Sequence, residues 1–176
     1  MGGYGCASVL RSPTAARDRG AQRLHADVVA AGGVVSDTRQ VTVLIPGEPV
    51  AQGRPRFVRR TGHAYDPPKS RSWKERASGV MARAVPAGPG WPLLGPCHVR
   101  VLAVFSCPPS DHHRIPVSRR LHAKNPDAEN VSKAVLDAGN GVLWRDDRQV
   151  CRLTVEKWIG AQGEDPFVQI DAWELY

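Results

Sequence analysis

Residues 126–159, PDAENVSKAVLDAGNGVLWRDDRQVCRLTVEKWI, are the most informative part of the sequence, because their pattern predicts a helix, a turn and a strand in succession. Asp127 suits the N-cap of the helix, and Gly139 and Gly141 are typical of its C-terminal end. Apolar and polar residues alternate over 149–159, which predicts a strand. The apolar face of the helix, spaced by three and four residues, consists of Val131, Ala134, Val135 and Ala138.

The residues around this stretch predict a small set of further elements, separated by Pro and Gly. In order, we expect a strand over 41–45, a small hairpin around Thr61 and Gly62, a helix capped by Ser70 or Ser72 and running to about Val85, a strand over 97–105, a loop over 108–125, the helix and strand above, and a last strand over 167–173. This order, β-α-β-α-β-β with a small early hairpin, indicates an α+β fold in which two main helices pack on a mixed β-sheet.

Length and composition limit the class of protein. The 176 residues suffice for one domain, which we expect over residues 41–176, after a disordered or flexible leader over residues 1–40. The apolar stretches fall far short of the ~20 residues that span a bilayer, which excludes an integral membrane protein. The cysteines form no C-x-x-C pair, which argues against a zinc ribbon or a disulfide scaffold and for reduced thiols in a cytoplasmic protein. They are Cys6, Cys97, Cys107 and Cys151.

The charge of the chain is unevenly distributed. Residues 41–100 hold ten Lys and Arg against three Asp and Glu, whereas residues 101–176 hold nine against eleven. A basic surface attracts a polyanion such as DNA, because Lys and Arg displace the counterions of phosphate groups. An acidic cluster beside a basic surface indicates a nuclease more specifically, since an enzyme that cuts nucleic acid needs carboxylates for a cation and basic residues for its substrate.

Three carboxylates flank the predicted helix and strand. Asp127 and Glu129 lie at the start of the helix, and Asp147 lies at the start of the strand, with the parity of the residues expected to face inward. If the strand lies beside the helix, we expect the three carboxylates to converge. Converging like charges need a counter-ion, and Mg²⁺ prefers oxygen ligands. Lys133, one helical turn after Glu129, would neutralise the carboxylates and the charge that develops on a phosphate under attack.

Each of these residues also has a purely structural interpretation, which the spacing alone leaves open. Asp127 is equally suited to capping the helix. Glu129 and Lys133 are equally suited to a surface ion pair, because they are four residues apart. Asp147 and its neighbour Asp146 are equally suited to a charged turn between the helix and the strand.

The run from Lys124 to Val150 closely resembles the RusA family of Holliday junction resolvases. The family pattern is K-x-P-D-x-D-N, followed by K-A-x-x-D-A-L, by N-G and by W-x-D-D-x-Q-V. Residues 53–56 and 155–157 resemble the family as well. The similarity therefore covers most of the chain, from about residue 43 to about residue 172.

The resemblance implies a homodimeric, Mg²⁺-dependent endonuclease, with Mn²⁺ as an alternative cation, that nicks four-way DNA junctions symmetrically in DNA recombination and repair. Carried over by position, the metal-binding and catalytic carboxylates are Asp127, Glu129 and Asp147, and the catalytic lysine is Lys133. The chain departs from the family at three positions. Glu129 replaces an aspartate, Gln52 stands where many relatives have lysine, and Gly139 stands where many have leucine.

The basic part of the chain is the expected DNA-binding surface. A junction is recognised through its backbone and shape, so we expect many phosphate contacts and few base contacts. The expected DNA-binding residues are Arg54, Arg56, Arg59, Arg60, Lys69, Arg71 and Lys74. Supporting roles, in capping or in orienting loops, are expected for Asn130, Asp137 and Asp146.

Other functions are compatible with parts of the sequence. Because Glu129 replaces an aspartate, the alternative is a branched-DNA-binding protein of the same fold whose catalysis is weakened. A restriction-type nuclease is disfavoured, since Glu156 and Lys157 lack the intervening residue of a (D/E)-x-K motif. A zinc site is not expected, because the spacing of the candidate ligands matches no common site. Those candidates are Cys107, His112, His113 and His122.

Overall fold

The computed structural model describes residues 39–54, 56–57, 60, 64–86 and 89–175. The expected leader, apart from its last two residues, lies outside the described residues, as do the expected turn at Thr61 and Gly62 and the side chain of Arg59. Within the described part, the predicted α+β class is confirmed, with two main helices and a mixed sheet. No described helix has the length and apolar character needed to cross a membrane.

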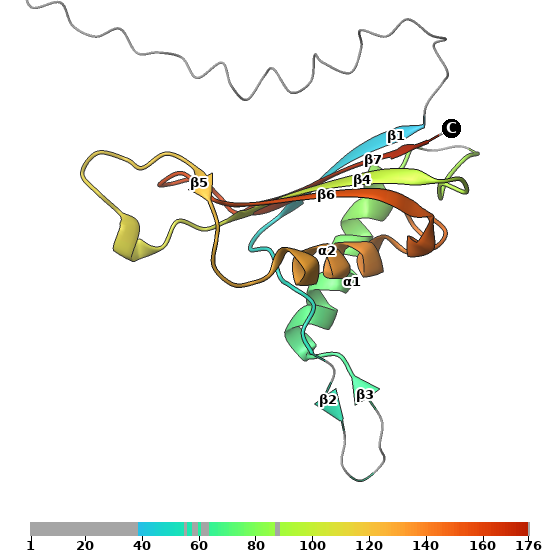
Figure 1. The fold of residues 1–176 in the computed structure, drawn as a ribbon, viewed down its shortest axis with the longest axis horizontal. Helices are drawn as coiled ribbons and strands as arrows, with labels where there is room; N and C mark the ends of the chain where they lie inside the picture. The colour runs from blue at the N-terminus through green and yellow to red at the C-terminus, as the bar shows by residue number, and fades with distance from the viewer. Residues whose placement is uncertain (1–38, 55, 58–59, 61–63, 87–88, 176) are drawn as a thin grey trace, which may run out of the picture. The chain divides into compact units, whose positions relative to one another are not determined.

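One mixed sheet of five strands forms the centre of the fold (Figure 1). The strands lie in the order β1-β7-β4-β6-β5, and β4 and β6 run parallel while the other neighbours are antiparallel. The parallel pair is joined by a crossover that carries α2, which places this helix on one face of the sheet. The strands are β1 (Gln40–Pro46), β4 (Cys97–Phe105), β5 (Arg120–Leu121), β6 (Val150–Ile159) and β7 (Phe167–Glu174), with β2 (Arg56–Phe57) and β3 (Ala64–Tyr65) forming a separate hairpin.

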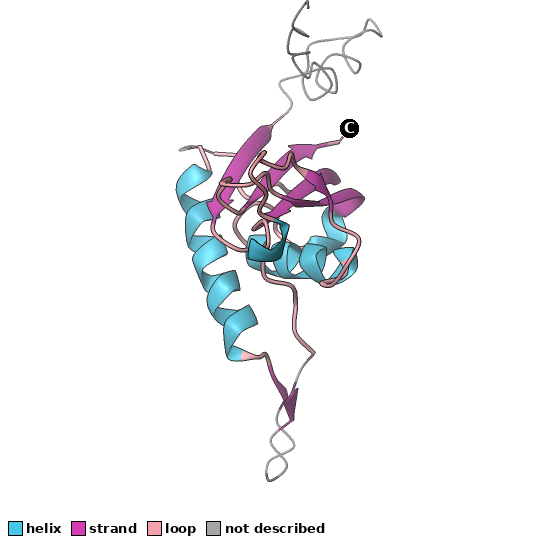
Figure 2. Ribbon diagram, turned by 90° about the vertical axis from the view of Figure 1, so that its left-hand side faces the viewer, coloured by secondary structure: helices cyan, strands magenta, loops and turns pink. Residues whose placement is uncertain are grey.

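Both helices, α1 (Pro68–Ala84) and α2 (Ala128–Gly139), lie on the same face of the sheet (Figures 1 and 2). The apolar stripe predicted for α2 is entirely buried. Together with Trp73, Ala77 and Met81 of α1, it packs against the inward residues of β1, β4 and β7 in one core. Two short 3₁₀ helices complete the described elements, namely η2 (Pro109–Asp111) and η3 (Asp147–Gln149).

α1 begins earlier than expected and has no side-chain cap. Pro67 occupies the N-cap position, and Pro68 is the first helical residue. Proline suits this position, because its backbone dihedral is already helical and its missing N–H is not needed there. Ser70, one of the two expected caps, is instead buried within the helix, and its hydroxyl donates a hydrogen bond to the side chain of Gln52 at 3.1 Å.

The outer part of β6 also differs from expectation. Alternation predicts that Cys151 and Leu153 face inward, but both side chains are exposed. β5 pairs only with Trp158 and Ile159, so within the described part of the chain the rest of β6 has no strand on its outer side. A register shift between β4 and the start of β6 also displaces Cys151 from the regular pairing. Alternation therefore identified the strand correctly but not its degree of burial.

Candidate active site

The loop that leads into α2 is held by the C-terminal half of β6. The ammonium group of Lys157 donates hydrogen bonds to the main-chain carbonyl oxygens of Lys124, at 2.8 Å, and of Pro126. The main-chain N–H of His122 donates to the carbonyl oxygen of Lys157 at 2.9 Å. These bonds fix the residue that precedes Asp127, so the position of Asp127 depends on that of β6.

The first turns of α2 carry exposed charged groups. Asp127 occupies the N-cap position, but its side chain makes no capping hydrogen bond. The nearest polar contact of this carboxylate is with Asn130, whose Nδ2 lies 3.5 Å from Oδ2. Asp127, Glu129 and Lys133 are all exposed, and none of them forms an ion pair with another described residue. These groups are therefore available to a ligand.

An open hollow of about 790 Å³ lies at this end of α2. It brings the basic side chains of Lys124 and Lys157 together with the carboxylate of Asp127. A second hollow, of about 510 Å³, shares His122 with the first and is also lined by Lys69. The mixture of ammonium and carboxylate groups is suited to a phosphate and a cation rather than to an apolar ligand.

Asp147 lies at the other end of α2. It begins η3, which follows the C-terminal end of α2 and directly precedes β6. β6 then runs back along the helix, and roughly 23 Å of strand separates its first residue from Lys157. α2 itself has 12 residues, or about 18 Å. In Figure 1, α2 lies below β6 and η3 follows at the right-hand end of both.

The three carboxylates therefore do not converge within one chain, contrary to the expectation from the sequence. A helix followed by a short turn places the next strand beside the end of the helix, not beside its start. Consistently, among the described residues no group of three or more acidic, His or Cys side chains is close enough to hold a metal ion. Within one chain, Asp127 and Glu129 share one end of α2, and Asp147 lies beyond the opposite end.

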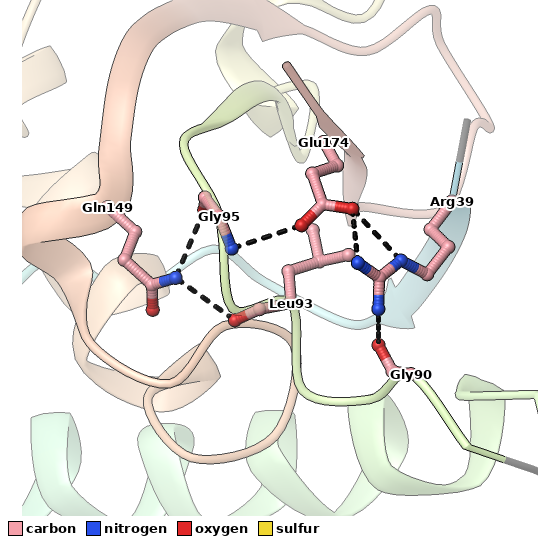
Figure 3. Close-up of polar contacts among 6 residues, drawn as sticks. All are labelled: Arg39, Gly90, Leu93, Gly95, Gln149 and Glu174. Carbon is pink, nitrogen blue, oxygen red and sulfur yellow. Dashed lines mark hydrogen bonds and ion pairs between the residues drawn. The ribbon is translucent and has the colours of Figure 1, made fainter. Parts of the chain in front are cut away.

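The end of η3, just before β6, is fixed by polar contacts with the loop before β4, and the end of β7 holds that loop in turn (Figure 3). The side-chain amide of Gln149 donates to the carbonyl oxygens of Leu93, at 3.1 Å, and of Gly95, at 3.0 Å. The carboxylate of Glu174 accepts hydrogen bonds from the N–H of Gly95, at 3.0 Å, and from Nε of Arg39, at 2.9 Å. This network holds η3 in place at the end of the sheet.

Asp146 caps η3, whereas Asp147 does not. The carboxylate of Asp146 accepts hydrogen bonds from the main-chain N–H of Arg148, at 3.0 Å, and from its guanidinium group, at 2.8 Å. In return, the side chain of Gln149 accepts from the N–H of Asp146 at 2.9 Å, which completes a capping box. The hydrogen bonds from Arg148 hold the pKa of the Asp146 carboxyl well below its ordinary value. Asp147 is exposed and forms no ion pair with a described residue.

The expected DNA-binding residues lie on the segment between β1 and α1 and on the first two turns of α1. Four of them have described, exposed side chains, namely Arg54, Arg60, Lys69 and Arg71. A fifth, Lys74, is described but is not exposed. Arg56 lies in β2, and the side chains of Arg56 and Arg59 are outside the described part. Exposed basic groups are suited to contacts with a phosphate backbone, and one of them, Lys69, lines the second hollow.

Lys74 is the exception, and the expectation that it binds DNA is corrected. Its ammonium group forms ion pairs with Asp66 and, at 3.1 Å, with Asp137, and its side chain is only 17% exposed. Burial alone would lower the pKa of Lys74, but the hydrogen bonds to both carboxylates outweigh burial and raise it. Gln52 donates to the same Asp66 at 3.0 Å. Lys74 therefore joins α1 to α2 through Asp137, which has a structural role here.

His122 is a site residue that the sequence did not identify as such. Its ring stacks on Phe105, with 4.7 Å between the ring centroids, and it lines both hollows. Its Nδ1 is buried and has no hydrogen-bond partner among the described residues. Burial, followed by the nearby charge of Lys157, lowers the pKa of His122. Its placement follows from contacts with Phe105 and Lys157, which are both remote in sequence, so no local pattern indicates it.

Comparison with known proteins gives two matches. A family model described as endodeoxyribonuclease RusA matches residues 46–171 of this chain. An uncharacterized protein of Bacillus subtilis strain 168, YqaN, is 33% identical over 132 residues, which cover 70% of this chain and 89% of that protein. The span matched by the family model includes both helices, both hollows and the candidate carboxylates.

Proposed function

We propose that this chain, which belongs to the RusA family of endodeoxyribonucleases, cuts Holliday junctions by paired, symmetric nicks. In this proposal it acts as a divalent-metal-dependent homodimer in DNA recombination and repair. The family itself implies a nuclease that acts on DNA. The observation that carries the finer proposal is the exposed group of Asp127, Glu129 and Lys133 beside a hollow lined by basic side chains. Such a group combines possible metal ligands with a site for phosphate.

Asp127 and Glu129 are the residues of one chain that would hold a divalent cation. Both are exposed carboxylates at the start of one helix, and carboxylate oxygens are the ligands that Mg²⁺ prefers and that Mn²⁺ also accepts. Because Asp147 lies beyond the other end of α2, a site with all three carboxylates requires Asp147 from a second copy of the chain. A cation bound there would lower the pKa of a coordinated water and polarise the scissile phosphate.

The lysines of the site act on the phosphate and on the loop. Lys133 lies one helical turn after Glu129, on the same side of α2, so its ammonium group is suited to stabilising the charge that develops on the phosphate. Lys124 lines the hollow and is suited to binding a neighbouring phosphate. Lys157 is committed to the carbonyl oxygens of Lys124 and Pro126, so it positions the loop that carries Asp127.

A second candidate function rests on Glu129. Its side chain is one methylene longer than the aspartate of the family pattern, so a bound cation would be held differently. The alternative is therefore a protein that binds branched DNA but cuts it slowly or not at all. Both candidates require salt-sensitive binding of a four-way junction, because both use phosphate contacts of Arg and Lys.

The test is cleavage of a synthetic four-way junction by the full chain, with a linear duplex of the same sequence as the control. We expect Mg²⁺-dependent nicks at symmetric positions in two opposite strands, and no such nicks with the Asp147→Asn variant. Binding of the junction without cleavage in Mg²⁺ or Mn²⁺, together with cleavage by Glu129→Asp, would favour the alternative. Absence of both binding and cleavage, by a folded protein, would reject both.

A further inference from the structure

The loop between β4 and β5, residues 106–119, projects beyond the sheet beside β5 (Figure 1). Near its tip, Ile115 is 82% exposed, and no large apolar side chain among the described residues is more exposed. A single exposed apolar residue is common on protein surfaces and indicates nothing by itself. The contacts of the residues on either side of Ile115, however, give this one a specific setting.

The base of the loop is closed by polar contacts. Asp111, the last residue of η2, forms an ion pair with Arg120 at the start of β5. The ring nitrogen Nε2 of His112 lies 3.3 Å from the main-chain carbonyl oxygen of Cys107. The tip of the loop, residues 113–118, therefore begins and ends at fixed points.

The turn between β6 and β7 braces the tip from the side. The side-chain oxygen of Gln162 accepts a hydrogen bond from the N–H of His113 at 3.0 Å, and the N–H of Gln162 donates to the carbonyl oxygen of Val117 at 3.0 Å. Pro116 has a fixed backbone angle and restricts Ile115 to extended conformations. The loop therefore presents its exposed apolar side chain in a geometry set in advance, which lowers the entropic cost of a contact.

The basic group beside Ile115 favours nucleic acid as the partner of the tip. Arg119, farther along the loop, is already paired with Glu164 and lies over the ring of Phe167, 5.6 Å from its centroid. Arg114, by contrast, is exposed and forms no ion pair with a described residue. A free guanidinium group is suited to a phosphate, and an apolar side chain next to it is suited to the face of a base.

The loop leads directly into the candidate site. His122, which lines both hollows, follows Ile115 by seven residues, so their Cα atoms are at most about 25 Å apart. That distance corresponds to about seven base-pair steps of roughly 3.4 Å. A junction that places a phosphate close to its branch point in the hollow at the start of α2 therefore brings the branch point within reach of Ile115.

Branched DNA offers a surface that a continuous duplex lacks. In a duplex each base pair is stacked on both faces, so an apolar side chain enters only by unstacking a step, which costs free energy. At the branch point of a four-way junction, the strands exchange partners and stacking is interrupted. An apolar side chain covers base faces there at a lower cost, so it favours the junction over the duplex.

We propose that Ile115 packs against the bases at the branch point of a four-way junction, while Arg114 binds an adjoining phosphate. This inference rests on the proposed function, and it names the element by which the chain distinguishes a junction from a duplex. Because the contact is with the faces of the bases and not with their edges, it does not depend on the base sequence.

Binding without a divalent metal tests the inference separately from cleavage. Fluorescence anisotropy with the full chain compares a synthetic four-way junction with a linear duplex of the same sequence. We expect Ile115→Ala to lower the affinity for the junction about tenfold and that for the duplex by less than about twofold. Ile115→Leu should keep the preference for the junction. Equal losses for the two DNAs, or no loss for the junction, would overturn the inference.

Two further variants serve as comparisons in the same assay. Leu44→Ala removes another exposed apolar side chain, 55% exposed on β1, and should change neither affinity. Arg114→Ala should weaken binding of the junction and the duplex by similar factors and reduce the salt dependence of binding by about one counter-ion, because it removes one phosphate contact. A loss for Arg114→Ala without any change in salt dependence would contradict the phosphate contact.

A fluorescent base analogue provides the second measurement. 2-Aminopurine brightens when it loses its stacked neighbours. We expect binding of the wild-type chain to raise its fluorescence about twofold or more at the branch point, and to leave it unchanged about ten base pairs along an arm. Ile115→Ala, at a concentration that saturates the junction, should lose most of this rise. A rise as large as that of the wild type would mean that Ile115 does not contact the bases.

These results are separable from the proposed function. A chain that shows the Ile115-dependent preference but does not cut junctions in Mg²⁺ or Mn²⁺ supports this inference and contradicts the proposed activity. A chain that cuts junctions, and whose Ile115→Ala variant binds them like the wild type, supports the activity and contradicts this inference.

Discussion

Lys157 of β6 is joined to Lys124 of the loop before α2 by a hydrogen bond of 2.8 Å, from the ammonium group to the main-chain carbonyl oxygen. The same ammonium group also binds the carbonyl oxygen of Pro126. A charged donor shared by two carbonyl groups is among the stronger polar contacts of a protein. It ties the loop that carries Asp127 to the sheet, so the position of Asp127 depends on a side chain of β6.

The first prediction concerns this contact. In Lys157→Met, the loop loses its anchor, and we expect the single-turnover rate of junction cleavage to fall by about tenfold to a hundredfold, because small displacements of reacting groups are costly. Junction affinity, measured by fluorescence anisotropy without metal, should change much less, since the ammonium group is occupied by carbonyl oxygens. Arg83→Met, at an exposed position of α1, is the control. An equal loss of affinity and rate would make Lys157 a DNA contact instead.

The second prediction concerns the separation of the carboxylates. Asp127→Asn and Asp147→Asn should each abolish cleavage. If a site combines Asp127 of one copy with Asp147 of another, mixing the two inactive variants creates heterodimers with one complete site. We therefore expect the mixture to recover single nicks, measured on a labelled junction. The double variant Asp127→Asn/Asp147→Asn, mixed with either single variant, should recover nothing. No recovery in the first mixture, despite subunit exchange, would contradict a shared site.

The third prediction concerns the ion pairs of Lys74. Lys74→Met leaves the carboxylates of Asp66 and Asp137 without their shared partner, and we expect a loss of about 1–3 kcal/mol in the free energy of unfolding in urea. Arg71→Met, an exposed neighbour, should change it by less than about 0.5 kcal/mol. The hydrogen bond from Lys74 lowers the pKa of Asp66, so its contribution is present above about pH 4 and is lost at lower pH. The free energy of unfolding of Lys74→Met should therefore change less than that of the wild type when the pH is lowered below about 4.

The fourth prediction concerns His122. Because burial lowers its pKa in the folded state, the unfolded chain binds a proton more readily. Its contribution to stability is therefore present above about pH 6.5 and is lost as the pH falls below that value. His122→Phe keeps an aromatic ring against Phe105 and removes the titrating group. We expect urea unfolding between pH 7 and 5 to depend less on pH in this variant, and an unchanged dependence would contradict the assignment.

Local sequence patterns predicted the fold because they report on single elements. The spacing of Val131, Ala134, Val135 and Ala138 is a property of one helix, and all four side chains are buried. The alternation over β4 similarly gave its bounds correctly. The same patterns failed for Leu153, because its exposure depends on how far the neighbouring strand extends along β6.

The candidate site could be predicted only in part, for a related reason. Asp127, Glu129 and Lys133 belong to one helix, so their proximity follows from their spacing. The position of Asp147 depends on the length of α2 and on the tight turn after it, where the N–H groups of Val142 and Leu143 donate to the carbonyl oxygen of Gly139. That turn keeps the start of β6 at the end of the helix. Which chain supplies the third carboxylate is a property of the assembly and not of any local pattern.

The last prediction concerns Gly139, the last residue of α2. A Cβ atom at this position would lie 2.3 Å from Cζ2 of Trp144, whose ring is completely buried. The indole N–H donates to the side chain of Asn140 at 3.0 Å, which restricts movement of the ring. The ring of Trp144 therefore fills the space that a side chain at Gly139 would occupy.

We accordingly expect Gly139→Ala to lower the free energy of unfolding by about 1–3 kcal/mol, as is usual when a packed core is overfilled. Gly79→Ala is the matched control, since Gly79 also lies in a helix but its Cβ would meet only Arg83 at 3.8 Å. Because alanine favours a helix over glycine, this control should gain up to about 1 kcal/mol. Urea unfolding followed by tryptophan fluorescence measures both variants. A stabilised Gly139→Ala would mean that Trp144 moves freely, and that the turn before η3 is not fixed by this contact.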